Sequence, residues 1–299
     1  MLTGSELWRI TSGKTKTRVA AIQLESQLGK TERNRSRAVE LLNEAGQNGT
    51  KLAVLPELST TGFSVGEDFA KMAEPIPGET TSILGKVAKK YDMYLVCGLP
   101  ERANIPGVIY NSVVLIGPRG SVLGKFRKLH VTLYLHTTDF LDEEREIFRP
   151  GNELPVFKTE LGNVGMLICQ DGDYPEPYRV LVLKGAEIVT VSVNTPRGFE
   201  EMWWKLYCAH AYMNGCFIIA SNKVGDEHYT FEGKEYVASF FGGSYVAGPL
   251  GQILAKGGDK EEIVYAEIDP SEVSSARWST KLLRDYRPEL YGTLSGTGN

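Results

Sequence analysis

The stretch Gly49-Thr-Lys-Leu-Ala-Val-Leu55 decides the fold, because its pattern returns at Gly185-Ala-Glu-Ile-Val-Thr-Val191. Each copy follows a predicted helix and continues as a short apolar run, which is typical of a strand buried on both faces. Tyr94-Leu-Val-Cys97 and Phe217-Ile-Ile-Ala220 form a second matching pair in the same order. The sequence therefore predicts an internal repeat of two α/β halves.

The repeat extends to two predicted hairpin turns, Gly117-Pro-Arg-Gly120 and Gly248-Pro-Leu-Gly251. Two such halves would pack their sheets face to face with helices outside, giving a four-layer α-β-β-α sandwich with a pseudo-two-fold repeat. No Pro-, Gly- and Ser-rich linker separates them, so we predict one domain over residues 18–277. An N-terminal arm, 1–17, and a C-terminal arm, 278–299, flank it, and the second is a candidate for a subunit interface.

The composition is that of an ordinary globular enzyme, with 42% hydrophobic residues, 23% charged residues and a net charge of −4. No long basic run indicates nucleic acid binding, and no apolar run is long enough to span a membrane. The polar N-terminal segment lacks the apolar core of a signal peptide. The four cysteines, Cys97, Cys169, Cys208 and Cys216, are few and lack metal-ligand spacing. They predict reduced thiols and a cytoplasmic location. We expect no metal, because no His/Cys ligand cluster exists, and no cofactor.

A cysteine ends one of the predicted buried strands. Cys169 directly follows the apolar run Val164–Ile168, and Asp173 and Pro175 suit the cap and first turn of a helix that begins next. A thiol at a strand-to-helix turn faces a cleft and lies near backbone N–H groups, which favour its reaction as a nucleophile. A small buried hydrophobe is the commoner fate of a free cysteine, so the local pattern leaves both interpretations open.

Two charged residues also follow predicted strands. Glu57 comes straight after the Leu55-Pro56 strand end, and Lys128 follows a predicted hairpin. Burying a charge is costly without a partner or a function, so Glu57 is a candidate base and Lys128 a candidate donor to an anionic oxygen. A turn cap and a solvated strand edge are the structural alternatives. His130 suggests a competing Cys–His pair, which we rank below a Cys–Glu–Lys site.

Taken together, three motifs resemble the nitrilase superfamily of carbon–nitrogen hydrolases over about residues 18–291: Leu55-Pro56-Glu57, Arg127-Lys128-Leu129-His130, and Ile168-Cys169-Gln170-Asp171 followed by Tyr174-Pro175-Glu176. The family fold is the same four-layer sandwich. The resemblance implies that Glu57 is the general base, that Cys169 attacks the carbonyl carbon, and that Lys128 with the backbone N–H of Gln170 stabilises the oxyanion. An ordinary thiol is mostly protonated at neutral pH, so a base beside it is chemically sensible.

The resemblance also implies a second glutamate ahead of the pair Pro150-Gly151. Glu144 has the spacing of carbamoylase-like members and Glu146 that of aliphatic amidases; we favour Glu144 because Phe148 lies two residues before Pro150. A solvated acidic loop from Glu143 to Glu146 is the structural alternative. Family members usually pair through outer helices, so a homodimer or higher homo-oligomer is expected, with the helices near Pro175 and around Met202–Met213 as candidates.

The substrate is predicted only as a class. Gln170-Asp171 departs from the Trp-Glu of true nitrilases, and Gly172-Asp173-Tyr174 lacks the arginines of N-carbamoyl-D-amino-acid hydrolases. The stretch from Asp171 to Glu176 is closer to aliphatic amidases, whereas Asn194-Thr195-Pro196 and Arg287–Tyr291 favour carbamoylase-like branches. A neutral or cationic amide, or a carbamoyl amine, fits best, with four candidate substrate-binding residues: Gln170, Asp173, Tyr174 and Asn194.

Three other functions remain open beside amide hydrolysis. Nitrile hydrolysis and acyl transfer to an acceptor other than water would use the same site, and a non-catalytic scaffold that binds partners would not need it. The intact set of Glu57, Lys128 and Cys169 argues against the scaffold. The aromatic run around Trp203 and Trp204 is predicted to be a helix packing face.

Overall fold

The strands of the first half alternate between two apolar environments. In a computed structural model, which describes residues 16–63, 65–131, 144–231 and 233–296, strand β1 (Thr17–Gln23) turns Val19 and Ala21 towards one buried cluster. Ala20 and Ile22 of the same strand join a second cluster. Because both faces of the strand are apolar, both must be covered, by helices on one side and by another sheet on the other.

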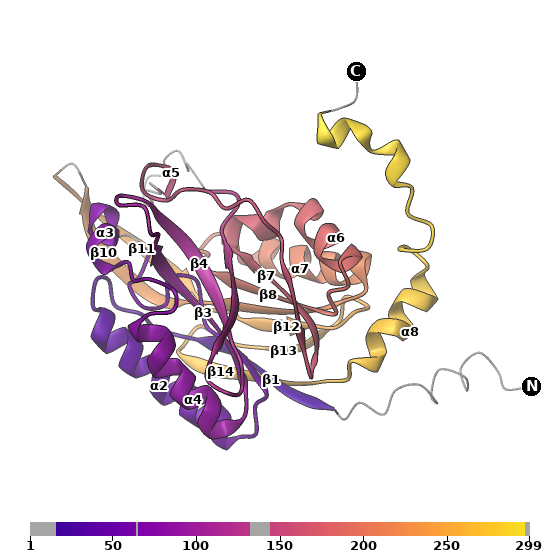
Figure 1. Ribbon diagram of the computed structural model, residues 1–299, viewed down its shortest axis with the longest axis horizontal. Coiled ribbons are helices and arrows are strands. Elements are labelled where there is room, and N and C mark those ends of the chain that lie inside the picture. The colour runs from indigo at the N-terminus through magenta and orange to yellow at the C-terminus, as the bar shows by residue number, and fades with distance from the viewer. Residues whose placement is uncertain (1–15, 64, 132–143, 232, 297–299) are drawn as a thin grey trace, which may run out of the picture.

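Two mixed six-stranded sheets form the centre of the molecule (Figure 1). The first sheet contains, in spatial order, β14 (Glu262–Ile268), β1, β2 (Leu52–Val54), β3 (Tyr94–Arg102), β4 (Ile109–Ile116) and β5 (Val122–Arg127). The second contains β6 (Val156–Thr159), β7 (Gly162–Ile168), β8 (Ile188–Val193), β9 (Phe217–Asn222), β12 (Tyr245–Ala247) and β13 (Ile253–Lys256).

The two sheets have equivalent orders, which confirms the predicted repeat. Strands β1, β2 and β3 are parallel, as are β7, β8 and β9, and the outer strands of each sheet run antiparallel to their neighbours. The sheets lie face to face, with β1 against β9 and β3 against β8. Hydroxyl groups join them, since Ser192 Oγ donates to the carbonyl of Leu55 over 2.8 Å and Ser221 Oγ to that of Ile22 over 2.7 Å.

Helices cover the outer face of each sheet, which completes the α-β-β-α sandwich (Figure 1). The first sheet is covered by α2 (Thr31–Gln47) and α4 (Glu79–Tyr91), whose apolar stripes include Leu42 and Leu84. The second is covered by α6 (Pro175–Leu183) and α7 (Glu200–Asn214). The remaining helices are α3 (Phe69–Met72), α5 (Glu144–Ile147), α8 (Ser271–Thr280) and the 3-10 turns η1 (Gly66–Asp68), η2 (Cys169–Asp173), η3 (Pro288–Leu290) and η4 (Gly292–Ser295).

A hairpin interrupts the second half of the repeat and was not predicted. Strands β10 (Val224–Phe231) and β11 (Lys234–Phe241) form a separate two-stranded sheet. They lie between β9 and β12 along the chain, although β9 and β12 are neighbours in the second sheet. A buried ion pair between Lys223 and Glu227 fixes its base, and Glu227 also accepts a hydrogen bond from the backbone N–H of Phe63 over 2.9 Å. The hairpin is therefore anchored to the loop that follows β2.

The C-terminal segment leaves the body of the molecule after α8 and runs outside α6 (Figure 1). The predicted start of the C-terminal arm, residue 278, falls inside this helix. The segment still contacts the body: Leu283 packs against the core, and the Arg179 guanidinium lies 5.2 Å from the ring centroid of Tyr286. The predicted N-terminal arm falls almost wholly outside the described residues.

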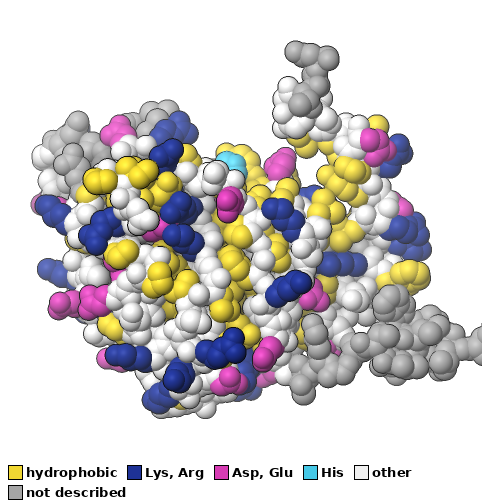
Figure 2. All heavy atoms as spheres, in the orientation of Figure 1, with side chains coloured by type: hydrophobic (Ala, Val, Ile, Leu, Met, Phe, Trp, Pro, Cys, Tyr) yellow, Lys and Arg dark blue, Asp and Glu magenta, His cyan; other side chains and the backbone are white. Residues whose placement is uncertain are grey.

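The described surface agrees with the charge pattern of the sequence. On the face in Figure 2, Lys and Arg side chains are interspersed with Asp and Glu and do not gather into one basic patch. None of the described helices is long and apolar enough to cross a membrane.

Candidate active site

Three predicted site residues meet at one end of the paired sheets. Glu57 follows β2, Lys128 follows β5 and Cys169 follows β7. Because β2 and β7 belong to the parallel centres of the two sheets, their carboxyl ends open at the same edge. β5 reaches that edge through two antiparallel turns of the chain.

A buried lysine bridges two carboxylates at this edge. Lys128 Nζ lies 2.9 Å from Glu57 Oε1 and also contacts Glu144 Oε2. All three side chains are at most 3% exposed. Asn111 Nδ2 donates to the same pair of carboxylates, over 2.7 Å to Glu57 Oε1 and 2.7 Å to Glu144 Oε1. The group carries a net negative charge when both glutamates are ionised, and Asn111 reduces their repulsion without adding charge.

Glu57 has the properties of a general base. Burial raises its pKa to about 7; the positive charge of Lys128 lowers the pKa, whereas the negative charge of Glu144 raises it. One of its oxygens, Oε2, is buried and has no hydrogen-bond partner among the described residues. Such an unused oxygen on a carboxylate that titrates near neutrality can accept a proton from a neighbouring group.

The thiol of Cys169 is that neighbouring group. Burial and the negative charge of Glu57 raise its pKa well above the ordinary value, while Lys128 opposes the change. The thiol is therefore protonated at neutral pH and needs a base to become a nucleophile. The backbone at Cys169 has φ +43°, a conformation that costs a residue other than glycine on the order of 1 kcal/mol and is concentrated at functional sites.

Two glycines allow the segments of the site to approach closely. A Cβ atom at Gly98 would lie 2.6 Å from the carbonyl oxygen of Pro56, directly before Glu57. A Cβ atom at Gly151 would lie 2.4 Å from the carbonyl oxygen of Arg127, directly before Lys128. The Pro150-Gly151 pair that suggested a second glutamate therefore has a structural reason, and the backbone N–H of Gly151 donates to the Lys128 carbonyl over 2.8 Å.

Asp171 connects the lysine segment to the cysteine turn. Its buried carboxylate accepts hydrogen bonds from the backbone N–H groups of Leu129, over 3.1 Å, and His130, over 2.9 Å. The His130 ring is 2.7 Å from the same carboxylate through Nδ1 and stacks on Tyr174 with centroids 4.0 Å apart. This engagement of His130 disfavours the alternative Cys–His pair.

The comparison with known proteins agrees with this geometry. A family model described as carbon–nitrogen hydrolase matches residues 18–278. This chain belongs to the carbon–nitrogen hydrolase family, the nitrilase superfamily. It is 33% identical to an N-carbamoylputrescine amidase of Oryza sativa, covering 94% of this chain and 95% of the relative. It is 31% identical to a human omega-amidase, over 93% and 97% of the two chains.

Two further similar proteins support the assignment of this chain to the carbon–nitrogen hydrolase family. A protein named nitrilase from Pyrococcus abyssi is 33% identical, over 92% of this chain and 98% of its own. The crystal structure of a carbon–nitrogen hydrolase from Helicobacter pylori has a TM-score of 0.80 at 29% identity, covering 93% and 98% of the two chains. Because the relatives bear amidase and nitrilase names, membership establishes the family and leaves the substrate open.

The two candidates for the second glutamate lie in different environments in this chain. Glu144 is buried and makes the expected contact with Lys128, whereas Glu146 is exposed. Glu143 lies outside the described residues. The geometry thus favours the register that we chose from Phe148 and Pro150.

The four candidate substrate-binding residues lie in different settings. Gln170 and Asp173 line a cavity with Cys169. Tyr174 is exposed beside His130, and Asn194 is buried, where its Nδ2 donates to the Glu57 carbonyl over 3.0 Å. The prediction that Asp173 caps α6 is wrong: Tyr174 holds the cap position, and no side-chain hydrogen bond caps the helix. Pro175 occupies the first turn as predicted.

The cavity that opens from Cys169 has a volume of about 700 Å³. Part of its lining comes from the start of α7, including Met202, Trp203 and Leu206, and part from Val237 in the unpredicted hairpin. Trp203, predicted to lie on a helix packing face, does pack in the core, at 3% exposure. Val237 could not be assigned to the cavity from the sequence, because the hairpin that carries it was not predicted.

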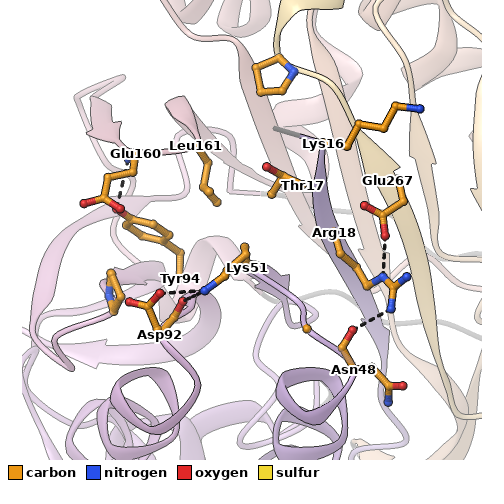
Figure 3. A pocket seen from close by; sticks show the side chains of 13 residues that line it. Lys16, Thr17, Arg18, Asn48, Lys51, Asp92, Tyr94, Glu160, Leu161 and Glu267 are labelled. Atoms are coloured by element: carbon orange, nitrogen blue, oxygen red, sulfur yellow. Dashed lines mark hydrogen bonds and ion pairs between the residues drawn. The ribbon is translucent and has the colours of Figure 1, made fainter. Parts of the chain in front are cut away.

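A second hollow, of about 620 Å³, lies at the opposite end of the strands (Figure 3). It is lined by residues that precede or begin strands, such as Lys51, Tyr94 and Leu161, and Figure 3 shows Lys51 paired with Asp92. It is therefore separate from the Cys169 site. Among the described residues, no three His, Cys, Asp or Glu side chains are grouped so that they could hold a metal ion.

Asn111 was missed by the sequence analysis, and its position gives a prediction about pH. We expect Asn111→Asp to shift the acid limb of the kcat/KM profile from near pH 7 to higher pH and to lower activity about tenfold at neutral pH. The hydrogen bond from Asn111 lowers the pKa of Glu57. Aspartate removes that donor and adds a negative charge, so the pKa of Glu57 rises and its ionised form becomes scarcer at a given pH.

The matched control is Asn163→Asp, since the Asn163 side chain also donates a hydrogen bond, partly buried, to the Gly185 carbonyl over 3.0 Å, at the far end of β7. The control should keep the limb near pH 7. An unshifted limb in Asn111→Asp would show that Asn111 does not set the ionisation of the base.

Proposed function

We propose that this protein hydrolyses a small linear amide or carbamoyl amine through a thioester on Cys169. The observation that carries the proposal is the unused Oε2 of Glu57 on a carboxylate whose pKa lies at about 7, beside a thiol whose pKa is raised. Neither group reacts well alone at neutral pH, and together they form a base and a nucleophile.

In the first half-reaction, Glu57 takes the proton of the Cys169 thiol and the sulfur attacks the carbonyl carbon. The oxyanion that forms is stabilised by the Lys128 ammonium and the backbone N–H of Gln170. The C–N bond then breaks, and the nitrogen leaves as ammonia or an amine with the proton that Glu57 had accepted. The acyl group remains on Cys169 as a thioester.

In the second half-reaction, Glu57 takes a proton from water, and the oxygen of that water attacks the thioester carbon. The C–S bond breaks, the thiolate recovers the proton from Glu57, and a carboxylic acid, or the carbamic acid from a carbamoyl substrate, leaves. Glu144 and Asn111 act throughout by holding Lys128 and Glu57 in position. The balance is one water consumed for each C–N bond cleaved.

The charge beside the thiol favours a neutral or cationic substrate. Asp173 lines the cavity with Cys169 and is one of the charges that raise the pKa of the thiol. A substrate carboxylate next to Asp173 would be repelled, and an ammonium group would be attracted. We therefore expect amides with a carboxylate close to the scissile bond to be poor substrates.

The test is a panel of amides, carbamoyl amines and nitriles, with ammonia release and the acid product both measured. Hydrolysis of an amide gives ammonia or amine and a carboxylic acid in equal amounts, whereas the carbamic acid from a carbamoyl amine decomposes to CO2 and ammonia. An acyl-transfer enzyme would release at most one amine for each Cys169 until an acceptor is added, and would then give the acylated acceptor in place of the acid. No turnover across the panel, with Cys169 unreactive towards iodoacetamide, would leave the scaffold interpretation instead; nitrile turnover alone would favour a nitrilase.

We further propose that two copies pair through α6 and α7. Exposed apolar side chains lie on these helices, among them Leu183 at 56% and Tyr212 at 45%, and the C-terminal arm exposes Leu290 at 64% and Leu294 at 69%. Burying such side chains between subunits is favourable. We expect sedimentation at micromolar concentration to give a dimer or larger species, and Leu183→Asp to weaken it; a monomer in the unchanged protein would contradict the pairing.

A cytoplasmic location remains part of the proposal. The four cysteines are all free thiols, two of them buried and two partly exposed. Free thiols, one of them a proposed nucleophile, are expected in a reducing compartment.

A further inference from the structure

The cavity beside Cys169 has one continuous apolar side. We call Phe199, Met202, Trp203, Leu206 and Val237 the apolar wall; all five line the cavity. The first four lie at helical spacing at and after the start of α7, so they share one face of the helix, and Val237 comes from β11. Two members are unusually exposed for large apolar side chains, Met202 at 54% and Val237 at 40%.

The wall is held rigidly on the helix side. Trp203 Nε1 donates to the Gly243 carbonyl over 3.0 Å, and its ring packs edge-on against Tyr245, with centroids 5.5 Å apart and planes at 78°. A second edge contact, with Tyr207, has centroids 4.9 Å apart. The wall is thus a preformed surface, as ligand cavities usually are.

The hairpin side is fixed at two places. The backbone N–H of Arg197 donates to the Ser239 carbonyl over 2.8 Å, which joins β11 to the loop after β8. Next to it, on the paired strand, the buried Lys223–Glu227 pair holds β10 to the body of the molecule, and Glu227 is the partner of Ala238 in the β10–β11 ladder. Val237 is therefore presented to the cavity by a supported strand.

We infer that the substrate of this site carries an apolar group of ring or branched-alkyl size, attached to the carbonyl carbon or to the nitrogen of the scissile bond. The inference rests on the proposed amide hydrolysis and adds the substrate class. The cavity, at about 700 Å³, is far larger than an acetamide needs, and exposed apolar side chains beside a nucleophile are costly unless a ligand covers them. The charged residues Asp173 and Arg197 line the same cavity, so the apolar group must lie along the wall.

The experiment compares kcat/KM for three amides on the full chain: acetamide, phenylacetamide and N-benzylacetamide. Covering a phenyl ring should raise kcat/KM about 10- to 100-fold over acetamide. A preference for phenylacetamide assigns the apolar group to the acyl side, and a preference for N-benzylacetamide assigns it to the nitrogen side. Either preference supports the inference.

Val237→Asp is the test variant, because a carboxylate there would oppose an apolar group. We expect the preference to fall at least about tenfold. Leu123→Asp is the matched control: Leu123 is 42% exposed on β5, and it does not line the cavity, so the preference should persist. If Val237→Asp does not fold, Met202→Asp on α7 tests the same wall.

Two negative results are distinguishable. Turnover of acetamide with no preference for either benzyl compound, or a preference unchanged in Val237→Asp, overturns the apolar substrate class and leaves amide hydrolysis standing. No turnover of any amide, with Cys169 still alkylated by iodoacetamide, overturns the proposed function and with it this inference.

Discussion

Cys169→Ala is expected to lower amide turnover by roughly 10⁴-fold or more while the fold stays intact, because the covalent step is lost and the other site groups have nothing to activate. Alanine keeps the Cβ atom and removes only the sulfur, so little packing changes. Initial rates with the best amide of the panel measure the loss, and circular dichroism with a thermal scan measures the fold.

Cys208→Ala is the matched control, since Cys208 is also partly exposed but lies on α7, away from Glu57. It should retain activity within about twofold. Substantial turnover in Cys169→Ala, or an equal loss in Cys208→Ala, would refute a thioester on Cys169. The same pair of variants tests the scaffold interpretation, for which neither thiol would matter.

The fold could be predicted where short segments carry their own signal. The apolar runs of β2, β8, β3 and β9 repeat in order, and turn residues bound them, so the sandwich followed from periodicity and order. The β10–β11 hairpin could not be predicted in this way. It has no counterpart in the first half, and long-range contacts hold it in place, notably Glu227 with the backbone N–H of Phe63.

The residues of the candidate site likewise differ in whether the local sequence marks them. Cys169, Glu57 and Lys128 follow strands and stand out locally. Asn111 does not, because it lies inside the apolar stretch of β4 and its two carboxylate partners are 54 and 33 residues away in sequence. Asp171 was noticed only as part of a motif, and its role in holding the lysine segment depends on contacts across 41 and 42 residues.

The choice between Glu144 and Glu146 leads to the second large effect. Glu144→Gln should reduce kcat by about 10²- to 10³-fold and change KM much less, since Lys128 would lose a charged partner and no longer be held where the oxyanion forms. A second consequence concerns pH. The negative charge of Glu144 raises the pKa of Glu57, so its removal should lower that pKa and move the acid limb of kcat/KM from near pH 7 to lower pH.

This shift is opposite in sign to the one expected for Asn111→Asp, so the two variants together test whether Glu57 is the titrating base. Glu146→Gln is the matched control, because Glu146 lies in the same short helix but is exposed, and it should keep both kcat and the position of the limb. An inactive Glu146→Gln beside an active Glu144→Gln would reverse the register and move the substrate proposal towards aliphatic amides. If both variants stay active, the second carboxylate is not needed to hold Lys128, and Glu57 alone must position it.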